Sequence, residues 1–386
     1  MKIAKIEALL VNASEKSNWS FIRVTTDDGV TGVGEASLQG WETVQLAYLE
    51  KLKEDLLGKT PEQALPLLRV HPHSLGGLVA NSIASALEQA VTDIRAKHAG
   101  VPIHALLGYA QRKTVRIYAN INRRTLDRTP AGFAQSAKDA VANGYTAIKI
   151  APFDDVYWEE FSDPEVKKRV ALGINRVFAT REAIGPGIDL MIDCHWRFDE
   201  AGATQLIRDL EPAKLFWMEC LISENPEYHA AMSRLRKYAN EWGTQIAGAE
   251  RQVGVSGFRS IVENKLMNVI MPDVKYAGGY NEMLQIAELT TQHGIAFSPH
   301  NPSGPVCTMA TLHLCALAGN FLIMEHQLAE SSVYLDIMKG EHPKLVDGCY
   351  TVPDTPGLGM ELNDNAIRAH PYKPLPASAL RDPRLG

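Results

Sequence analysis

The sequence has few cysteines, and their arrangement suggests no site. The five cysteines, Cys194, Cys220, Cys307, Cys315 and Cys349, are odd in number, scattered, and never form a Cys-x-x-Cys pair. Neither a disulfide framework nor a zinc site made of thiolates is therefore implied. We expect most of these side chains to be buried, reduced thiols.

Two further absences narrow the class of protein. No uninterrupted apolar stretch approaches the roughly 20 residues that span a bilayer. The first residues, Met1 to Lys5, alternate like a strand instead of opening a signal peptide. The net charge is −6, and no extended basic patch is present to meet a phosphate backbone. We therefore expect a cytoplasmic protein that binds neither membrane nor nucleic acid.

The chain is long enough to bury a large core, and its first part has a mixed pattern. Of its 386 residues, 45% are hydrophobic and 22% charged, as in an ordinary globular protein. Residues 1–36 alternate apolar and polar side chains around a turn at 27–29, which predicts an antiparallel sheet with a hairpin. From Trp41 to Gly108 the apolar residues follow the helical period. This part is therefore predicted to be an α+β module.

The remainder shows short apolar runs separated by amphipathic stretches, which is typical of repeated βα units. Eight runs can be counted, and eight parallel strands with helical crossovers favour a closed barrel because closure leaves no exposed edge. An open doubly wound sheet is the alternative, but no Gly-x-Gly-x-x-Gly follows the first run. The predicted strands are residues 115–119, 147–150, 190–193, 215–219, 245–250, 269–273, 295–300 and 321–325.

An ionisable residue ends six of these runs, at intervals of about one strand plus one helix. The C-terminal strand ends of a barrel converge on one face, where active sites are built. Carboxylates on adjacent strands repel one another unless a cation lies between them. Each one alone would more often be a solvated strand end or part of an ion pair, but the regular spacing favours a site for one divalent ion. All-oxygen ligation indicates Mg²⁺, with Mn²⁺ as a substitute. The six residues are Asp193, Glu219 and Glu250, the predicted metal ligands, and Asp273, His300 and Glu325.

The other three of the six suggest acid–base chemistry. Asp273 and His300 end neighbouring runs, so we expect a dyad in which the carboxylate fixes the imidazole tautomer and raises its basicity. His300 is then a candidate general base, and the alternative is a histidine held by the backbone of its loop. Glu325 could hydrogen-bond the carboxylate end of a substrate, or form a salt bridge at the barrel rim.

Two further residues are candidates for the same pocket. His195 lies two residues beyond Asp193, and on a strand this spacing places both side chains on one side. We interpret His195 as a proton donor to a leaving group, with a metal ligand or a partner of a ligand carboxylate as alternatives. Lys149 could supply positive charge to a substrate carboxylate, or form a rim salt bridge. Such a site suits removal of the proton next to a carboxylate, followed by loss of water from the β-carbon.

On these residues the sequence resembles the enolase superfamily and, within it, the mandelate racemase subgroup. The resemblance covers nearly the whole chain, including Pro-Gly-Leu-Gly-Met-Glu at 356–361. It implies an α/β fold with an α+β capping domain at 1–112, a (β/α)7β TIM-like barrel at 113–350, and a segment, 351–386, that packs back on the capping domain. It also implies the three metal ligands and the dyad named above, and a homo-oligomer.

Three local sequences bear on the reaction that the resemblance implies. The second-strand motif Lys-x-Lys is Lys149-Ile150-Ala151 here, so one of two opposed bases is missing and a two-base racemase is disfavoured. Asp193-Cys194-His195 resembles the Asp-x-His element of galactonate dehydratases, where the histidine is the acid. The fourth run ends in Glu219-Cys220-Leu221 instead of the commoner Glu-Glu-Pro.

The resemblance therefore implies an Mg²⁺-dependent hydro-lyase that converts a sugar acid to a 2-keto-3-deoxy acid. Aldonates such as galactonate are the leading substrate class and aldarates the second. Residues 38–41 are expected to close over the substrate. The alternatives are an epimerase or racemase with the same base, a non-catalytic scaffold, and a metal-dependent barrel hydrolase, which usually has several histidine ligands.

Overall fold

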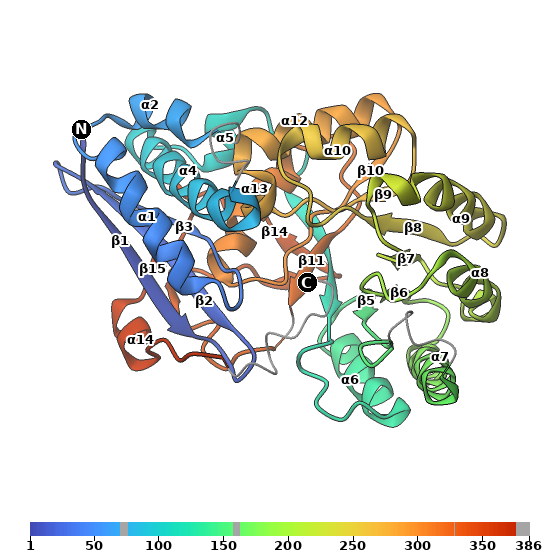
Figure 1. The fold of residues 1–386 in the computed structure, drawn as a ribbon. Coiled ribbons are helices and arrows are strands. Elements are labelled where there is room, and N and C mark those ends of the chain that lie inside the picture. The colour runs from blue at the N-terminus through green and yellow to red at the C-terminus, as the bar shows by residue number, and fades with distance from the viewer. Residues whose placement is uncertain (70–75, 157–162, 328, 376–386) are drawn as a thin grey trace.

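The computed structural model describes residues 1–69, 76–156, 163–327 and 329–375, and its first part is an α+β module (Figure 1). Three antiparallel strands form one sheet, and the predicted hairpin turn joins the second to the third. The elements are β1 (Ile3–Asn12), β2 (Asn18–Thr26), β3 (Thr31–Glu35), α1 (Glu42–Leu56), α2 (Pro61–Ala64), η1 (Leu65–Leu68), α4 (Gly77–Ala99) and α5 (Ile103–Leu107).

Close backbone contact joins the long helix α4 to β3. An added Cβ at Gly32 would lie 2.0 Å from the Ala90 carbonyl oxygen, and one at Gly34 would lie 1.9 Å from that of Ala86. Only glycine permits this approach, because any side chain would force the helix off the sheet. The module's core therefore depends on two glycines that occupy alternate positions of one strand.

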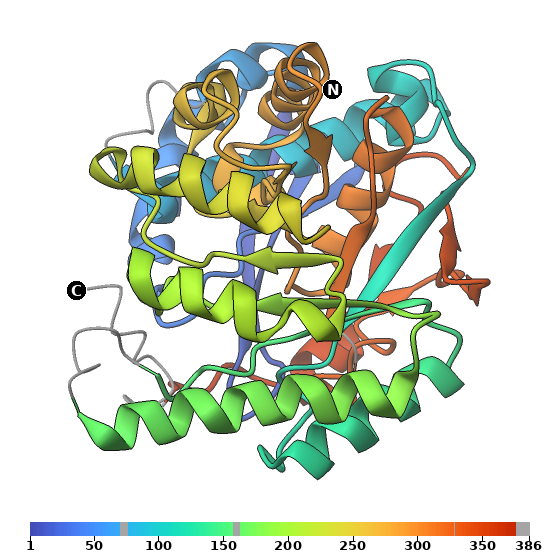
Figure 2. The same ribbon diagram turned by 90° about the vertical axis from the view of Figure 1, so that its right-hand side faces the viewer.

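Eight parallel strands follow and close into a barrel, which confirms the predicted (β/α)7β fold (Figure 2). From the first strand to the seventh, each pairs with the next, and the eighth pairs with the first. An isolated bridge between Phe297 and Phe321 links the seventh strand to the chain just before the eighth. The strands are β4 (Thr114–Asn120), β5 (Ala147–Ile150), β6 (Asp189–Asp193), β7 (Trp217–Glu219), β8 (Gln245–Gly248), β9 (Val269–Ile270), β10 (Ala296–Phe297) and β11 (Met324–Gln327).

A helix lies in each of the seven intervals between these strands. The crossover helices are α6 (Pro130–Ala142), α7 (Pro164–Ile184), α8 (Glu200–Asp209), α9 (His229–Glu241), α10 (Gly254–Glu263), α12 (Tyr280–Gln292) and α13 (Pro305–Leu317). Short turns η4 (Glu211–Ala213), η5 (Pro226–Tyr228) and α11 (Val274–Ala277) accompany them. In the part of the chain that the structure describes, no helix is both long and apolar enough to cross a membrane.

Several strands end earlier than predicted. β9 and β10 stop before Pro272 and Pro299, because proline has no N–H to donate to a sheet. β8 stops at Gly248, and the next residue, Ala249, has a φ of 71°. Asp273, His300 and Glu250 therefore lie in loops just beyond the strands. The eighth strand, predicted at residues 321–325, begins and ends later in the structure, because β11 starts at Met324.

Buried side chains fill the barrel interior, so the space for a ligand lies at one end. One cluster, against which Ala296 of β10 packs, takes side chains from seven of the eight strands or their immediate flanks: Tyr118, Ala147, Met191, Trp217, Ala247, Val269, Met271 and Ile323. Large and small residues are combined in this layer, which fills the inside of the barrel. All five cysteines are free and four of them are buried.

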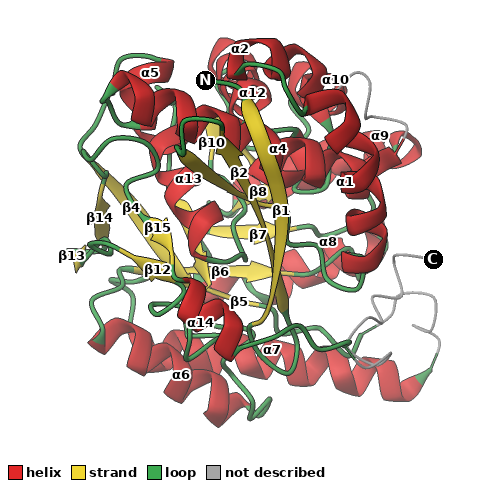
Figure 3. Ribbon diagram, turned by 90° about the vertical axis from the view of Figure 1, so that its left-hand side faces the viewer, coloured by secondary structure: helices red, strands yellow, loops and turns green. Residues whose placement is uncertain are grey.

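The end of the described chain touches both parts of the molecule. β13 (Leu345–Val346) and β14 (Cys349–Thr351) extend the barrel sheet beside β4, and β12 (Met338–Lys339) pairs with β15 (Glu361–Leu362). α14 (Asp364–Ala369) lies beside the first sheet (Figure 3), where Asp364 pairs with Arg23 and Pro371 bridges to Val11. The proposed domain boundaries at 112/113 and 350/351 stay predictions.

Candidate active site

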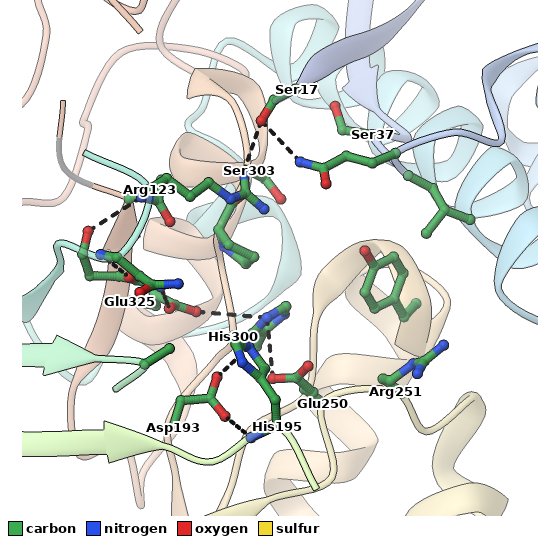
Figure 4. Close-up of a pocket in the computed structure, with 18 of the residues that line it drawn as sticks. Ser17, Ser37, Arg123, Asp193, His195, Glu250, Arg251, His300, Ser303 and Glu325 are labelled. Carbon is green, nitrogen blue, oxygen red and sulfur yellow. Dashed lines mark hydrogen bonds and ion pairs between the residues drawn. The ribbon is translucent and has the colours of Figure 1, made fainter. Parts of the chain in front are cut away.

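A cavity of about 550 Å³ lies between the first module and the barrel (Figure 4). Residues 17–19 and 37–39, together with Trp41, line it on one side, and residues at the barrel strand ends line it on the other. The structure thus places Leu38, Gln39 and Trp41 of the segment expected to close over a substrate at the cavity. Of the predicted site residues, Lys149, Asp193, His195, Glu250, His300 and Glu325 line the cavity, while Glu219 and Asp273 are fully buried behind it.

Two of the three predicted metal ligands lie side by side. Asp193 and Glu219 are register partners at the ends of β6 and β7. One oxygen of each, with the Sγ of Cys220, forms a group whose atoms all lie within 4.8 Å of one another. Burial raises the pKa of Glu219 well above its ordinary value, Lys149 opposes this rise, and Asp193 adds to it. Such crowding of like charge is what a cation would relieve.

The third predicted ligand, Glu250, lies slightly apart from this group. The residue is 7% exposed, and its Oε2 accepts no hydrogen bond from any described residue, although His300 Nε2 lies 3.3 Å away. Its charge nevertheless acts on the carboxyl group of Glu219. An orphaned buried oxygen beside two crowded carboxylates fits a hard divalent cation. Asp193, Glu219 and Glu250 are the residues that could hold Mg²⁺.

The backbone beside each of these carboxylates has an unusual conformation. His195 and Trp196 after Asp193, Cys220 after Glu219, and Ala249 before Glu250 have φ values of 47°, 56°, 49° and 71°. Residues with side chains rarely adopt this left-handed region, at a cost of roughly 1–3 kcal/mol each. The alternation argument for His195 was therefore wrong, because β6 ends at Asp193 and the chain turns there.

His195 nevertheless lines the cavity, held between two carboxylates. Its Nε2 lies 2.9 Å from Asp193 Oδ2, and its Nδ1 lies 3.1 Å from Asp154 Oδ1. Burial lowers the pKa of His195, but the two carboxylates raise it by more than burial lowers it. The resulting pKa is about 10. The raised pKa favours the protonated imidazole, which is the form that can donate a proton. Sequence reasoning missed Asp154, which lies in an irregular loop after β5 and has no pattern to mark it.

His300 and Asp273 form the predicted pair. The Nδ1 of His300 lies 2.9 Å from Asp273 Oδ2, so its Nε2 faces the cavity. Lys275, which the sequence reasoning missed, contacts the same carboxylate through its Nζ, at 2.6 Å, and also contacts Ser303. The signal available in the sequence was the position of this lysine, two residues after Asp273. Asp273 is thus fixed from two sides, and it in turn orients the His300 ring.

Lys149 is already paired within the protein. Its buried ammonium lies 2.7 Å from Glu219 Oε1 and 2.8 Å from Glu325 Oε1. Glu325 also accepts hydrogen bonds from the Asn120 side chain and the Asn301 backbone, both at 2.8 Å, and its pKa is lowered. Burial alone would raise the pKa of Glu325, and the charge of Lys149 is the largest of the effects that lower it. The lowered pKa favours the ionised carboxylate, which accepts the hydrogen bonds of these donors.

Arg123, a basic residue that was not predicted, also lines the cavity. Arg123 pairs with Glu330 at 2.8 Å and donates to the Pro302 carbonyl at 3.2 Å. Its Nη1 also lies 3.3 Å from Ser17 Oγ, which belongs to the first module. Arg123 thus joins the barrel to the first module at the cavity wall.

A (β/α)7β barrel with carboxylates and an Asp–His pair at its strand ends, covered by an α+β module, defines an enolase-type barrel enzyme. Residues 132–366 match the family model described as enolase C-terminal domain-like. Residues 7–108 match that of the mandelate racemase / muconate lactonizing enzyme N-terminal domain. The chain belongs to the mandelate racemase / muconate lactonizing enzyme family of the enolase superfamily, which confirms the resemblance.

Relatives and solved structures agree with this assignment. The chain is 30% identical to D-xylonate dehydratase of Haloferax volcanii over 371 residues, 91% of this chain and 85% of that protein. It is 28% identical to D-galactonate dehydratase of Pectobacterium atrosepticum, covering 95% and 94%. A mandelate racemase/muconate lactonizing enzyme structure from Jannaschia sp. CCS1 superimposes with a TM-score of 0.85 at 27% identity, covering 97% of this chain and 98% of that one.

Proposed function

We propose that this protein is an Mg²⁺-dependent sugar-acid dehydratase, a hydro-lyase that forms a 2-keto-3-deoxy acid. Relatives named as dehydratases of D-xylonate and D-galactonate support an aldonate as the first substrate class, with aldarates second. One observation carries the proposal. Two histidines in different environments line one cavity, His300 backed by Asp273 and His195 held between two carboxylates.

The metal would be held by the carboxylates. Asp193, Glu219 and Glu250 would bind Mg²⁺, with Mn²⁺ as a substitute, and the ion would polarise the substrate carboxylate and stabilise negative charge on the enediolate. Lys149 keeps a positive charge in the cavity wall beside them. The orphaned Oε2 of Glu250 supports this assignment.

His300 would remove the proton α to the substrate carboxylate. Asp273 occupies the Nδ1 side of its ring, which leaves Nε2 as the acceptor that faces the cavity. The α C–H bond breaks, its electron pair forms the enediolate, and the proton passes to Nε2. Asp273 then stabilises the imidazolium that results.

His195 would act as the acid in the second half of the reaction. It gives its proton to the β-hydroxyl group, the C–O bond breaks, and the oxygen departs as water. The enol that remains tautomerises to the 2-keto-3-deoxy acid. Ala151 lines the cavity at the end of β5 and offers no second base, which supports dehydration over racemisation.

A panel of sugar acids tests the proposal. The purified protein with Mg²⁺ is incubated with aldonates and aldarates, and 2-keto acid formation is followed. We expect turnover of one group of acids, and its loss in a His300→Asn variant. His98→Asn, at an exposed position of α4, is the matched control. Absence of turnover with every acid, or an epimer formed without loss of water, would contradict the proposal.

A further inference from the structure

Lys275 is a buried cation to which the proposed reaction assigns no part. The residue is 1% exposed, and its Nζ lies 2.6 Å from Asp273 Oδ2 and donates to the Ser303 hydroxyl. Its backbone N–H donates to Asp273 Oδ1 at 2.8 Å. Burial lowers the pKa of Lys275, but the charge of Asp273 raises it by more, which favours the ammonium form. One residue therefore holds both oxygens of the Asp273 carboxylate.

This arrangement bears on His300, because the lysine and the histidine share one carboxylate oxygen. Asp273 Oδ2, which Lys275 Nζ contacts, also lies 2.9 Å from Nδ1 of His300. A hydrogen bond orients a ring only as well as its acceptor is itself fixed. Without the ammonium group, Oδ1 would keep its backbone donor, whereas Oδ2 would be free to move with the imidazole. The position of the proposed base thus depends on the lysine side chain.

The first module holds the short helix α11, which carries Lys275. A helix of one turn leaves its carbonyl groups without partners of its own, so they need donors from elsewhere. The α4 helix supplies two of these donors. Ser85 Oγ donates to the Val274 carbonyl at 2.7 Å, and Asn81 Nδ2 donates to the Tyr276 carbonyl at 2.8 Å. The carbonyls on either side of the lysine are therefore fixed by the module.

A buried carboxyl group of the module approaches the same lysine from β3. Glu35 accepts hydrogen bonds from the backbone N–H groups of Gly304, at 2.7 Å, and Cys307, at 2.9 Å. Ser303, whose hydroxyl group binds Lys275, directly precedes Gly304. Burial raises the pKa of Glu35, and the charge of Lys275 is the largest of the effects that oppose this. The module thus meets the surroundings of the lysine at two places.

We propose that Lys275 is a positioning residue, which fixes the Asp273 carboxylate and thereby orients His300 toward the α-proton of the substrate. The first module takes part, because Ser85 and Asn81 hold the backbone from which the lysine reaches Asp273. The module therefore covers the cavity and also helps to place the base. The inference rests on the proposed function and adds to it a residue and a contact between the two parts of the chain.

Kinetics with an aldonate carrying either hydrogen or deuterium at its α-carbon test the lysine. The probe is the aldonate that the wild type turns over best, and all proteins are assayed well below their Tm. We expect Lys275→Met to lower kcat by roughly tenfold to a hundredfold, with little change in KM. The α-deuterium isotope effect should rise, because proton removal becomes slower relative to the later steps. Lys275→Arg keeps a cationic donor and should recover part of kcat.

Ser85→Ala tests the part played by the module, with Ser82→Ala as the matched control. Ser82 lies three residues earlier on α4, and its hydroxyl group donates to the Val79 carbonyl of the same helix. We expect Ser85→Ala to lower kcat by roughly twofold to tenfold, as the loss of one neutral hydrogen bond would, and to raise the isotope effect. Ser82→Ala should behave like the wild type. Ser85→Ala keeps the lysine, so it tests the inference even if Lys275→Met does not fold.

The isotope effect separates a positioning role from a structural one. A variant that only loses folded protein has a lower kcat but the isotope effect of the wild type. That result for Lys275→Met, or an unchanged kcat, would overturn the inference alone. Equal behaviour of Ser85→Ala and Ser82→Ala would overturn the part played by the module. Absence of turnover by the wild type would instead contradict the proposed function.

Discussion

Glu88 joins the covering module to the barrel through a single buried carboxyl group. From α4 it accepts hydrogen bonds from the first backbone N–H groups of α12, those of Tyr280 at 3.0 Å and Asn281 at 3.4 Å. Gly279 makes room for it, because an added Cβ there would lie 2.5 Å from Glu88 Oε2. Burial raises the pKa of Glu88 from 4.5 to about 7, and the two N–H donors only partly oppose this.

This raised pKa makes stability depend on pH. A carboxyl group whose pKa is higher in the folded state binds its proton more tightly there, so its stabilising contribution is complete below about 4.5 and is lost as pH rises through about 7. The shift corresponds to roughly 3 kcal/mol in total, most of it between pH 5 and 8.5. Glu88→Gln removes this titration and keeps an oxygen that can accept from α12.

Urea unfolding of the wild type, Glu88→Gln and the exposed control Glu54→Gln at pH 5, 7 and 8.5 measures the effect. We expect the wild type to lose stability relative to Glu88→Gln by roughly 2–3 kcal/mol from the lowest to the highest pH. The control should follow the wild type. Parallel pH dependences of the wild type and Glu88→Gln would refute the reasoning.

Three further predictions concern packing and the cavity. Lys149→Met leaves two buried carboxylates without their cationic partner, and in EDTA it should lower the free energy of unfolding by roughly 3–5 kcal/mol. Adding Mg²⁺ should restore part of this loss, and unchanged urea midpoints would contradict the prediction. Gly34→Ala places a Cβ 1.9 Å from a backbone oxygen of α4 and should lower Tm far more than Gly187→Ala, which meets open space; equal Tm values would count against it. Arg123→Ala should raise KM by roughly tenfold with a smaller change in kcat, because the residue lines the cavity but does not belong to the proposed acid–base pair. A loss confined to kcat in steady-state kinetics would argue otherwise.

The sequence was most informative where the chain repeats. The spacing of one strand plus one helix predicted that Asp193 and Glu219 would be neighbours, and they are register partners on adjacent strands. The same argument placed Asp273 and His300 together, and their side chains lie 2.9 Å apart. Periodicity serves here because a closed barrel brings equivalent positions of every repeat to one face.

Irregular backbone limits the same reasoning. Alternation along a strand cannot describe His195 or Cys220, because both lie in left-handed turns after the strands end. Asp154 lies in a loop whose path no pattern defines, and Arg123 meets Ser17 only through the packing of two modules. Asp154, which orients the proposed proton donor, and Arg123, which lines the cavity, could therefore be found only from the structure.

Exchange of the α-proton in D₂O tests the central claim most directly. A turned-over sugar acid is incubated with wild type, His195→Asn and His300→Asn, and both α-deuteration and keto-acid formation are followed by NMR. If His300 is the base and His195 the acid, His195→Asn will incorporate deuterium without forming the keto acid, and His300→Asn will do neither. Deuterium incorporation that continues in His300→Asn would contradict the account.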